Sequence, residues 1–144
     1  FAPMTRIEDA MICYSEVTGC EPSASFMTIT CKSSEEMQSQ TPAVIHQDGT
    51  ARPQLVEHTT HPFIHKVISE YYQLTKHYSV INTSFNIRGE PIVRTPNEAY
   101  NCFASTDMDV LVLGNYMIIK QNLNPDKIIK VDPKKIHEHD MEII

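Results

Sequence analysis

The stretch VINTSFNIRGEP, residues 80–91, carries the strongest indication of fold and function in this chain of 144 residues. A short apolar strand, expected over Tyr78–Ile81, leads into four small polar side chains, an arginine and a glycine. Such a segment buries little apolar surface, yet it offers several hydrogen-bond donors and one positive charge at the end of a strand. Binding residues are often found on loops that a rigid scaffold positions. The stretch therefore predicts a ligand site at this strand end.

Downstream of this stretch, local signals predict one helix and one hairpin. Thr95-Pro96-Asn97-Glu98 is a capping box with proline at the first helical position, and Ala99, Cys102 and Phe103 follow as a buried stripe. Gly114-Asn115 separates two apolar runs, residues 110–113 and 116–119, so a two-residue hairpin is expected there. In the tail beyond residue 120, only residues 128–131 resemble a strand.

Upstream, helix and strand signals are mixed. A capping box at Thr5 and Glu8 predicts a helix over about residues 5–16, and Pro62 begins a second helix whose apolar spacing extends to about His77. The polar segment 33–40 is expected to be a loop, and Asp48-Gly49 a turn. The runs that predict strands by β-propensity or alternation are residues 26–31, 43–46 and 52–58. The mixture indicates an α/β (α+β) protein with a mixed, twisted sheet flanked by helices.

Composition narrows the class of protein. Eighteen acidic residues against twelve basic ones give a net charge of −6, which argues against a nucleic-acid partner. No apolar run approaches the ~20 residues that span a bilayer, so no membrane association is expected. The four cysteines lack CxxC spacing, so we interpret them as free thiols in a reducing cytoplasm.

The 82–93 stretch, with Thr95-Pro96 and Glu98-Ala99 behind it, resembles the C-terminal signature of the O-carbamoyltransferases, which include nodulation-type and antibiotic-tailoring enzymes. Further matches occur in the family's order: Phe1-Ala2-Pro3, Phe26-Met27, His46, Asp48–Arg52, Gln54 and Leu111–Gly114. The resemblance covers residues 1–120, leaving 121–144 as a C-terminal extension. It implies a YrdC/Sua5-like domain that begins partway through, because the upstream basic residues, including a catalytic lysine, are not among these residues.

The resemblance also implies a reaction. In the family, a YrdC-like domain converts carbamoyl phosphate and ATP to carbamoyl adenylate, with Mg²⁺ expected on the nucleotide. A separate N-terminal Kae1-like domain, which holds iron, then transfers the carbamoyl group to a hydroxyl acceptor. Arg52 and Ser84 are the expected catalytic residues. The expected contacts to nucleotide or carbamoyl phosphate are Met27, Asp48, Asn82, Thr83, Asn86 and Arg88.

The chemistry of these side chains suits phosphate binding, but several of them have alternative roles. Arginine donates two parallel hydrogen bonds to phosphate, and neutral hydroxyl and amide groups adapt to oxyanions. The polar side chains of the loop could instead satisfy its own backbone, and Arg88 could pair with Glu90. His61 and His65 have a metal-chelating spacing, although no metal is expected here. The alternative functions are a non-catalytic nucleotide-binding or partner-docking module and, less favoured, a Sua5-like tRNA-modifying protein.

Overall fold

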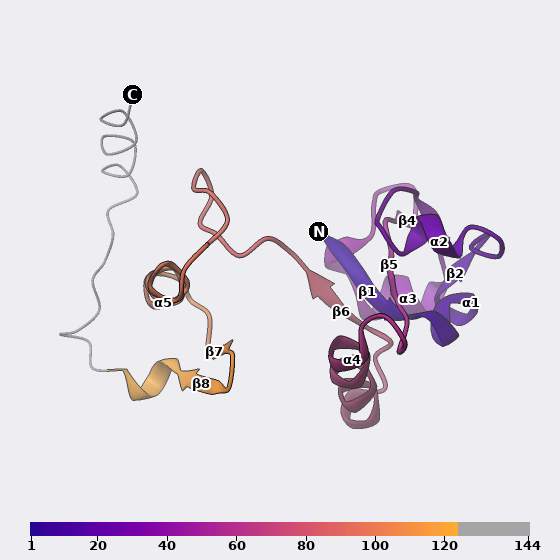
Figure 1. Cartoon of the computed structure of the whole chain (residues 1–144). Helices are drawn as coiled ribbons and strands as arrows, with labels where there is room; N and C mark the ends of the chain where they lie inside the picture. Colours follow the sequence, from indigo (N-terminus) through magenta and orange to yellow (C-terminus); the bar gives the residue numbers. More distant parts are fainter. Residues whose placement is uncertain (124–144) are drawn as a thin grey trace. The chain divides into compact units, whose positions relative to one another are not determined.

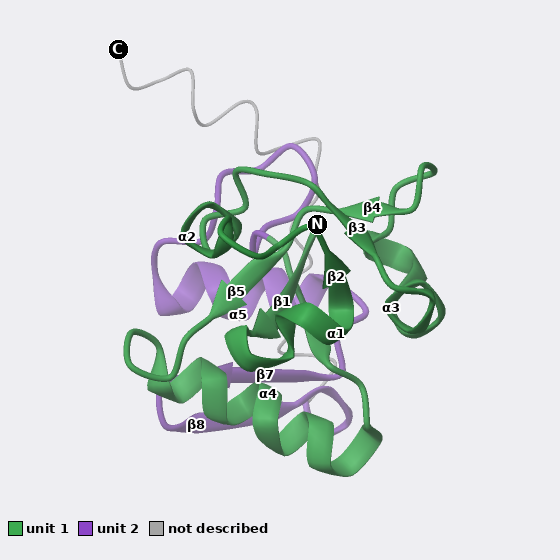
Figure 2. Cartoon of the chain, turned by 90° about the vertical axis from the view of Figure 1, so that its right-hand side faces the viewer, with its two compact units in different colours: residues 1–83 green, residues 84–144 purple. Residues whose placement is uncertain are grey.

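The structure, a computed structural model, describes residues 1–123 (Figure 1). The chain divides into two compact units, Phe1–Thr83 and Ser84–Ile144 (Figure 2). The division lies inside the polar stretch 80–91, so residues that are adjacent in the motif belong to different units. No helix within residues 1–123 has the length and apolar character needed to cross a membrane.

The first unit contains a mixed sheet built around its N-terminal strand. Strand β1 (Ala2–Arg6) pairs in parallel with β5 (Gln54–Val56) and antiparallel with β6 (Ser79–Asn82). The registers Met4↔Gln54 and Ala2↔Asn82 fix where these strands end. Helix α4 (Pro62–Thr75) packs against β1 and β6. The sheet thereby brings the polar end of β6 beside the N-terminal end of β1.

A second sheet and several short helices complete the first unit. Strands β2 (Tyr14–Ser15), β3 (Cys31–Ser33) and β4 (Thr50–Ala51) form an antiparallel sheet in that order. The short helices are α1 (Ala10–Cys13), α2 (Glu21–Ala24) and α3 (Glu35–Gln40), with 3₁₀ turns at Ile7–Asp9 and Pro42–Val44. Their apolar side chains form one buried cluster with the sheet: Ala10, Cys13, Tyr14, Val17, Ala24, Cys31, Met37, Ala51 and Leu55. This core holds β4, and thus the start of the Arg52 segment, in place.

In the described part of the second unit, residues 84–123, the chain forms an α-helix and a hairpin. Helix α5 (Pro96–Ser105) begins as its capping box predicts, because the Thr95 side chain accepts a hydrogen bond from the backbone N–H of Glu98. Strands β7 (Val110–Leu113) and β8 (Tyr116–Ile119) pair antiparallel through a turn in which Gly114 has φ +58. A 3₁₀ turn, Lys120–Asn122, follows the hairpin.

The fold class is confirmed, as are the helices that begin at Pro62 and Pro96, the strand near residues 78–81 and the hairpin. Within residues 1–123 the strands lie in three small sheets, and of these only the sheet of β5, β1 and β6 is mixed. The tail strand expected over residues 128–131 lies outside the described residues.

Four local predictions are wrong. Residues 2–6 form β1, and only Ala10–Cys13 of the expected first helix is α-helical, since two partner strands satisfy the backbone of residues 2–6. Segment 26–30 is turn and irregular backbone, and strand β3 begins only at Cys31. Segment 35–40 is a helix rather than a loop because Ser34 caps it, accepting from Met37 N. The strand expected over 43–46 does not form, because residues 42–44 are a 3₁₀ turn behind Pro42. A fifth prediction, the strand over 52–58, is right in type but shortens to Gln54–Val56.

Candidate functional site

The Asp48 turn is the first element of the candidate site. One carboxylate oxygen of Asp48, Oδ1, accepts hydrogen bonds from the backbone N–H of Thr50 at 3.0 Å and from its hydroxyl at 2.7 Å. Between them Gly49 has φ +78, a left-handed conformation that favours glycine. The hydrogen bond from the Thr50 side chain is the main reason that the pKa of Asp48 is lowered. Asp48 is therefore a turn-forming carboxylate that stays ionised at neutral pH.

Arg52 follows this turn directly. The Asp48 turn leads into β4, whose residue Ala51 is fully buried, and Arg52 comes next with its side chain exposed. No ion pair within residues 1–123 involves Arg52. A guanidinium held next to a buried strand and not engaged by a carboxylate is suited to bind a phosphate group.

Asn82 lies at the end of β6 in contact with two residues from distant segments. Its Nδ2 donates to Oε1 of Gln54 at 2.5 Å and lies 3.9 Å from Sδ of Met27. The predicted residues Met27 and Asn82 are thus brought together, although Met27 lies in a turn with φ +58 rather than in a strand. Positive φ at a residue other than glycine is uncommon, and the contact with Asn82 is one constraint on Met27.

The loop beyond β6 has two kinds of polar side chain. Thr83 and Ser84 are exposed. Asn86 instead donates from Nδ2 to the carbonyl oxygens of Ile87 at 3.1 Å and Glu90 at 2.9 Å, so it closes the loop on itself. This contact fits the structural role that Asn often has in turns. Arg88 is exposed, and within the described chain no ion pair joins it to Glu90.

The predicted site residues are divided between the two units. Met27, Asp48, Arg52, Asn82 and Thr83 lie in the first unit. Ser84, Asn86 and Arg88 lie in the second unit. The first unit positions its members through the two small sheets, whereas the second positions its members through one hydrogen-bonded loop.

Two polar residues beside the predicted site were not among the expected ligands. Gln54 orients Asn82, and His46 contacts the Asp48 turn through Nδ1, which lies 2.9 Å from the Thr50 hydroxyl. Both belong to the run of residues 46–54 that carried the resemblance. The signal that could have marked them was their place in that run, next to Asp48 and Arg52, which were already expected to be site residues.

The histidines near α4 take part in a different network. Nε2 of His65 lies 2.8 Å from the Glu8 carboxylate, and the ring of His58 meets that of His65 edge-on at 5.3 Å. Arg6 pairs with Asp9 at 2.6 Å beside this network. Across residues 1–123, no group of three or more His, Cys, Asp or Glu side chains is arranged to hold a metal ion.

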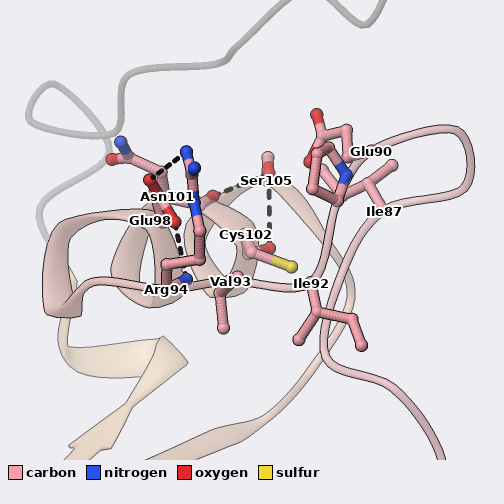
Figure 3. A pocket seen from close by; sticks show the side chains of 10 residues that line it. Ile87, Glu90, Ile92, Val93, Arg94, Glu98, Asn101, Cys102 and Ser105 are labelled. Carbon is pink, nitrogen blue, oxygen red and sulfur yellow. Dashed lines mark hydrogen bonds and ion pairs between the residues drawn. The ribbon is translucent and has the colours of Figure 1, made fainter.

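The second unit contains a cavity of about 220 Å³ between α5 and the loop that precedes it (Figure 3). The lining is mostly apolar on the loop side and polar on the helix side: Ile87, Glu90, Pro91, Ile92, Val93, Arg94, Glu98, Asn101, Cys102 and Ser105. Glu98 accepts from the backbone N–H of Arg94, which lowers the pKa of Glu98. Burial raises the pKa of the Cys102 thiol, so this cysteine stays protonated. The sequence singled out Cys102 only as a core residue of the helix.

Comparison with known proteins identifies a matching family and several similar proteins. The family model described as "Carbamoyltransferase C-terminus" matches residues 1–120. An uncharacterized protein of Synechocystis sp. is 47% identical over 83 residues, which are 58% of this chain and 14% of that protein. Nodulation protein NolO of Bradyrhizobium diazoefficiens is 35% identical over 121 residues, 84% of this chain and 22% of that protein. Nodulation protein NolNO of Sinorhizobium fredii is 35% identical over 126 residues, 88% of this chain and 18% of that protein.

This chain thus spans less than a quarter of the length of each of these relatives. The match to the family model nevertheless extends from Phe1 through β8 to Lys120, and includes every residue of the candidate site. The chain belongs to the carbamoyltransferase C-terminus family.

Proposed function

We propose that this chain is the part of a carbamoyltransferase in which carbamoyl phosphate and ATP are converted to carbamoyl adenylate. A separate N-terminal Kae1-like domain of the same enzyme, which holds iron, receives the adenylate and transfers the carbamoyl group to a hydroxyl acceptor. The observation that carries the proposal is family membership over residues 1–120, with Arg52 exposed beside the Asp48 turn.

The geometry around Arg52 supports phosphate binding. Adenylate formation brings anionic groups together, so its catalysis depends chiefly on positioning and on fixed positive charge. In the proposed reaction, Arg52 holds a phosphate group and Ser84 donates to an oxyanion. Mg²⁺ would be held mainly by the oxygens of ATP, because magnesium seldom requires an all-protein cage.

The remaining predicted residues have different proposed parts. Asn82 and Met27 are already in contact, and they offer an amide and a thioether next to the strand end, where they would contact the nucleotide. Thr83 and Arg88 are exposed and offer a hydroxyl and a guanidinium. Asn86 supports the loop through its two backbone contacts, so its expected effect on binding is indirect.

The test uses the intact enzyme that carries this chain. We expect Arg52→Ala and Ser84→Ala to lower pyrophosphate release from ATP by about 10²–10³-fold, the range seen when one transition-state donor is removed. Lys66→Ala and Ser39→Ala, on exposed faces of α4 and α3, serve as matched controls and should keep normal rates. Near-normal pyrophosphate release in both site variants would overturn the assignment of the site.

A second candidate function, docking on a partner domain, is favoured by an apolar stripe on α4. Phe63, Val67 and Leu74 lie on one side of this helix with exposed fractions of 71%, 43% and 85%. Monomeric proteins seldom expose such a stripe without a partner. Replacing all three residues by Gln should abolish binding to the isolated N-terminal domain in a sedimentation experiment. Unchanged binding would exclude this face as the docking surface.

A further inference from the structure

His46 belongs to a chain of hydrogen bonds that determines which of its ring nitrogens carries a proton. Its Nδ1 lies 2.9 Å from the Thr50 hydroxyl, and that hydroxyl lies 2.7 Å from Oδ1 of Asp48. The ends of the loop are also joined by the backbone, since His46 N donates to Thr50 O at 2.7 Å. The position of the His46 side chain is therefore restrained by hydrogen bonds of its backbone N–H and of its ring Nδ1.

The proton positions follow from the donors available. Hydrogen bonds from Thr50 lower the pKa of Asp48, which is thus ionised at neutral pH and can only accept. The Thr50 hydroxyl has one proton, and at 2.7 Å it donates that proton to Asp48. Thr50 must then accept from His46, so Nδ1 carries a proton and the neutral ring has its lone pair on Nε2. A carboxylate that fixes an imidazole tautomer in this manner is known from catalytic triads, where it acts without an intervening hydroxyl.

The lone pair on Nε2 is directed away from the Asp48 turn. His46 is exposed, and no hydrogen bond within residues 1–123 involves its Nε2. Lys32 is the cross-strand neighbour of Thr50, and Arg52 lies two residues beyond Thr50. The charged groups around the imidazole are thus the Asp48 carboxylate on its own turn, Lys32 on β3 and Arg52 after β4.

The residues around His46 thus include two cations, Lys32 and Arg52, and an acceptor, Nε2 of His46. A complementary ligand carries an anionic group for Arg52 and an N–H donor for Nε2. Carbamoyl phosphate has both, because its phosphate is anionic and its other end is an NH₂ group. Acetyl phosphate has the same shape with a methyl group in place of NH₂, and it offers no donor. A site group that accepts a hydrogen bond from the NH₂ group discriminates against the analogue that lacks this donor.

We propose that His46 is a specificity-determining residue, whose Nε2 accepts a hydrogen bond from the carbamoyl NH₂ and selects carbamoyl phosphate over other acyl phosphates. The proposal rests on the proposed function, because it takes the site of Arg52 to be the site of carbamoyl phosphate. Asp48 and Thr50 position this histidine. Oδ1 of Asp48 is engaged by Thr50 and does not contact the ligand.

The first test determines the tautomer in this chain without any ligand. In a long-range ¹H–¹⁵N spectrum, neutral His46 should show a protonated Nδ1 and an unprotonated Nε2, with its signals assigned through their loss in His46→Asn. Thr50→Val keeps the side-chain shape but removes the acceptor, and should return His46 toward the Nε2-protonated form. A neutral His46 that is protonated on Nε2 in the wild-type chain would overturn the proposal.

The second test measures the affinity of the intact enzyme for carbamoyl phosphate and acetyl phosphate by calorimetry. We expect the wild type to prefer carbamoyl phosphate by about tenfold, the effect of about one hydrogen bond. His46→Asn keeps an N–H donor near Thr50 but lacks Nε2, so the preference should fall to about one while the affinity for acetyl phosphate stays the same. His61→Asn, an exposed histidine before α4, is the control.

The outcomes separate this inference from the proposed function. Equal weakening of both ligands in His46→Asn would indicate a purely structural role and would overturn the inference, as would an unchanged preference. If both ligands bind through Arg52 but the wild type shows no preference, the proposed function stands and the inference fails. If the wild type binds neither acyl phosphate, the proposed function fails and the inference fails with it.

Discussion

The two units, as far as the structure describes them, differ in how their apolar side chains are buried around the residues of interest. In the first unit, nine residues form one buried cluster around Tyr14 and Met37, both of which have at most 1% of their surface exposed. In the second unit, one face of the β7–β8 hairpin has its apolar side chains exposed: Val110, Val112, Met117 and Ile119. The first unit therefore supplies a rigid scaffold for Arg52 and Asn82. The second holds its loop mainly through α5 and hydrogen bonds.

The largest expected effect concerns the buried cluster. Met37→Ala should lower the free energy of unfolding of the first unit by about 2–5 kcal/mol, because the variant loses buried surface and leaves a cavity. Val112→Ala, on the exposed hairpin face, should change stability by less than ~0.5 kcal/mol. Urea denaturation followed by amide hydrogen exchange in each unit measures both. Equal effects of the two substitutions would contradict the contrast between the units.

The second expected effect concerns the residue that joins hairpin and helix in the second unit. Lys120 donates from Nζ to the carbonyl oxygens of Phe103, Ala104 at 3.0 Å and Thr106 at 2.6 Å, at the end of α5. Lys120→Met keeps the aliphatic stem but removes the charged donor that these three carbonyls share. We expect α5 to lose about 1–3 kcal/mol of stability, as for hydrogen bonds to a charged group.

Hydrogen exchange of the α5 amides tests this prediction. Protection should fall in α5 and stay unchanged in β1 of the first unit. Lys66→Met, on the exposed face of α4, is the matched control. Loss of protection in both units would show that the two units unfold together, which would contradict a separate effect of Lys120 on α5.

A smaller effect is expected from removing a helix N-cap, Ser34 in the first unit or Thr95 in the second. Ser34 accepts from Met37 N at 3.2 Å, and Thr95 accepts from Glu98 N at 3.2 Å. Ser34→Ala and Thr95→Ala should each cost about 1 kcal/mol. Helix α3 is anchored by buried Met37, so its exchange protection should persist in Ser34→Ala, while the first turn of α5 frays in Thr95→Ala. Equal fraying of both helices would mean that burial does not support α3.

The smallest effect is a dependence of stability on pH. The pKa values of Asp48 and Glu98 are both lowered, the first by hydrogen bonds from Thr50 and the second by the backbone N–H of Arg94. A carboxylate with a lowered pKa stabilises the folded state above its unfolded pKa, and this contribution disappears as the pH falls through the folded pKa. Stability should therefore decline below about pH 4.

A carboxyl ¹³C titration measures the two groups separately. The midpoint of Asp48 should lie below 3.8 and that of Glu98 below 4.5, their ordinary values. Thr50→Val should raise the midpoint of Asp48 and leave that of Glu98 unchanged. A midpoint for Asp48 at its ordinary value would show that the Thr50 hydroxyl does not donate to this carboxylate, which is the contact on which the proton assignment of His46 depends.

Local signals predicted well those elements whose causes lie within a few residues. The Thr95 capping box begins α5, Pro62 begins α4, and the Gly114 turn closes the hairpin, because each signal acts through backbone groups three or four positions away. The exposed positions of Arg52 and Ser84 also agree with their places after the Asp48-Gly49 turn and after the short strand near residue 81. Family membership required only the order and identity of the residues.

Contacts between distant segments of the chain decided the remaining features of the fold and the site. Residues 2–6 become the central strand of a sheet because partners about 50 and 80 positions away complete their hydrogen bonds, and no local pattern contains that information. For the same reason, the contact of Asn82 with Met27 and Gln54 could not be read from spacing. The sequence by itself thus determined the family, the starts of α4 and α5 and the candidate residues. Packing between distant segments determined which of those residues meet and how the Asp48 turn holds His46.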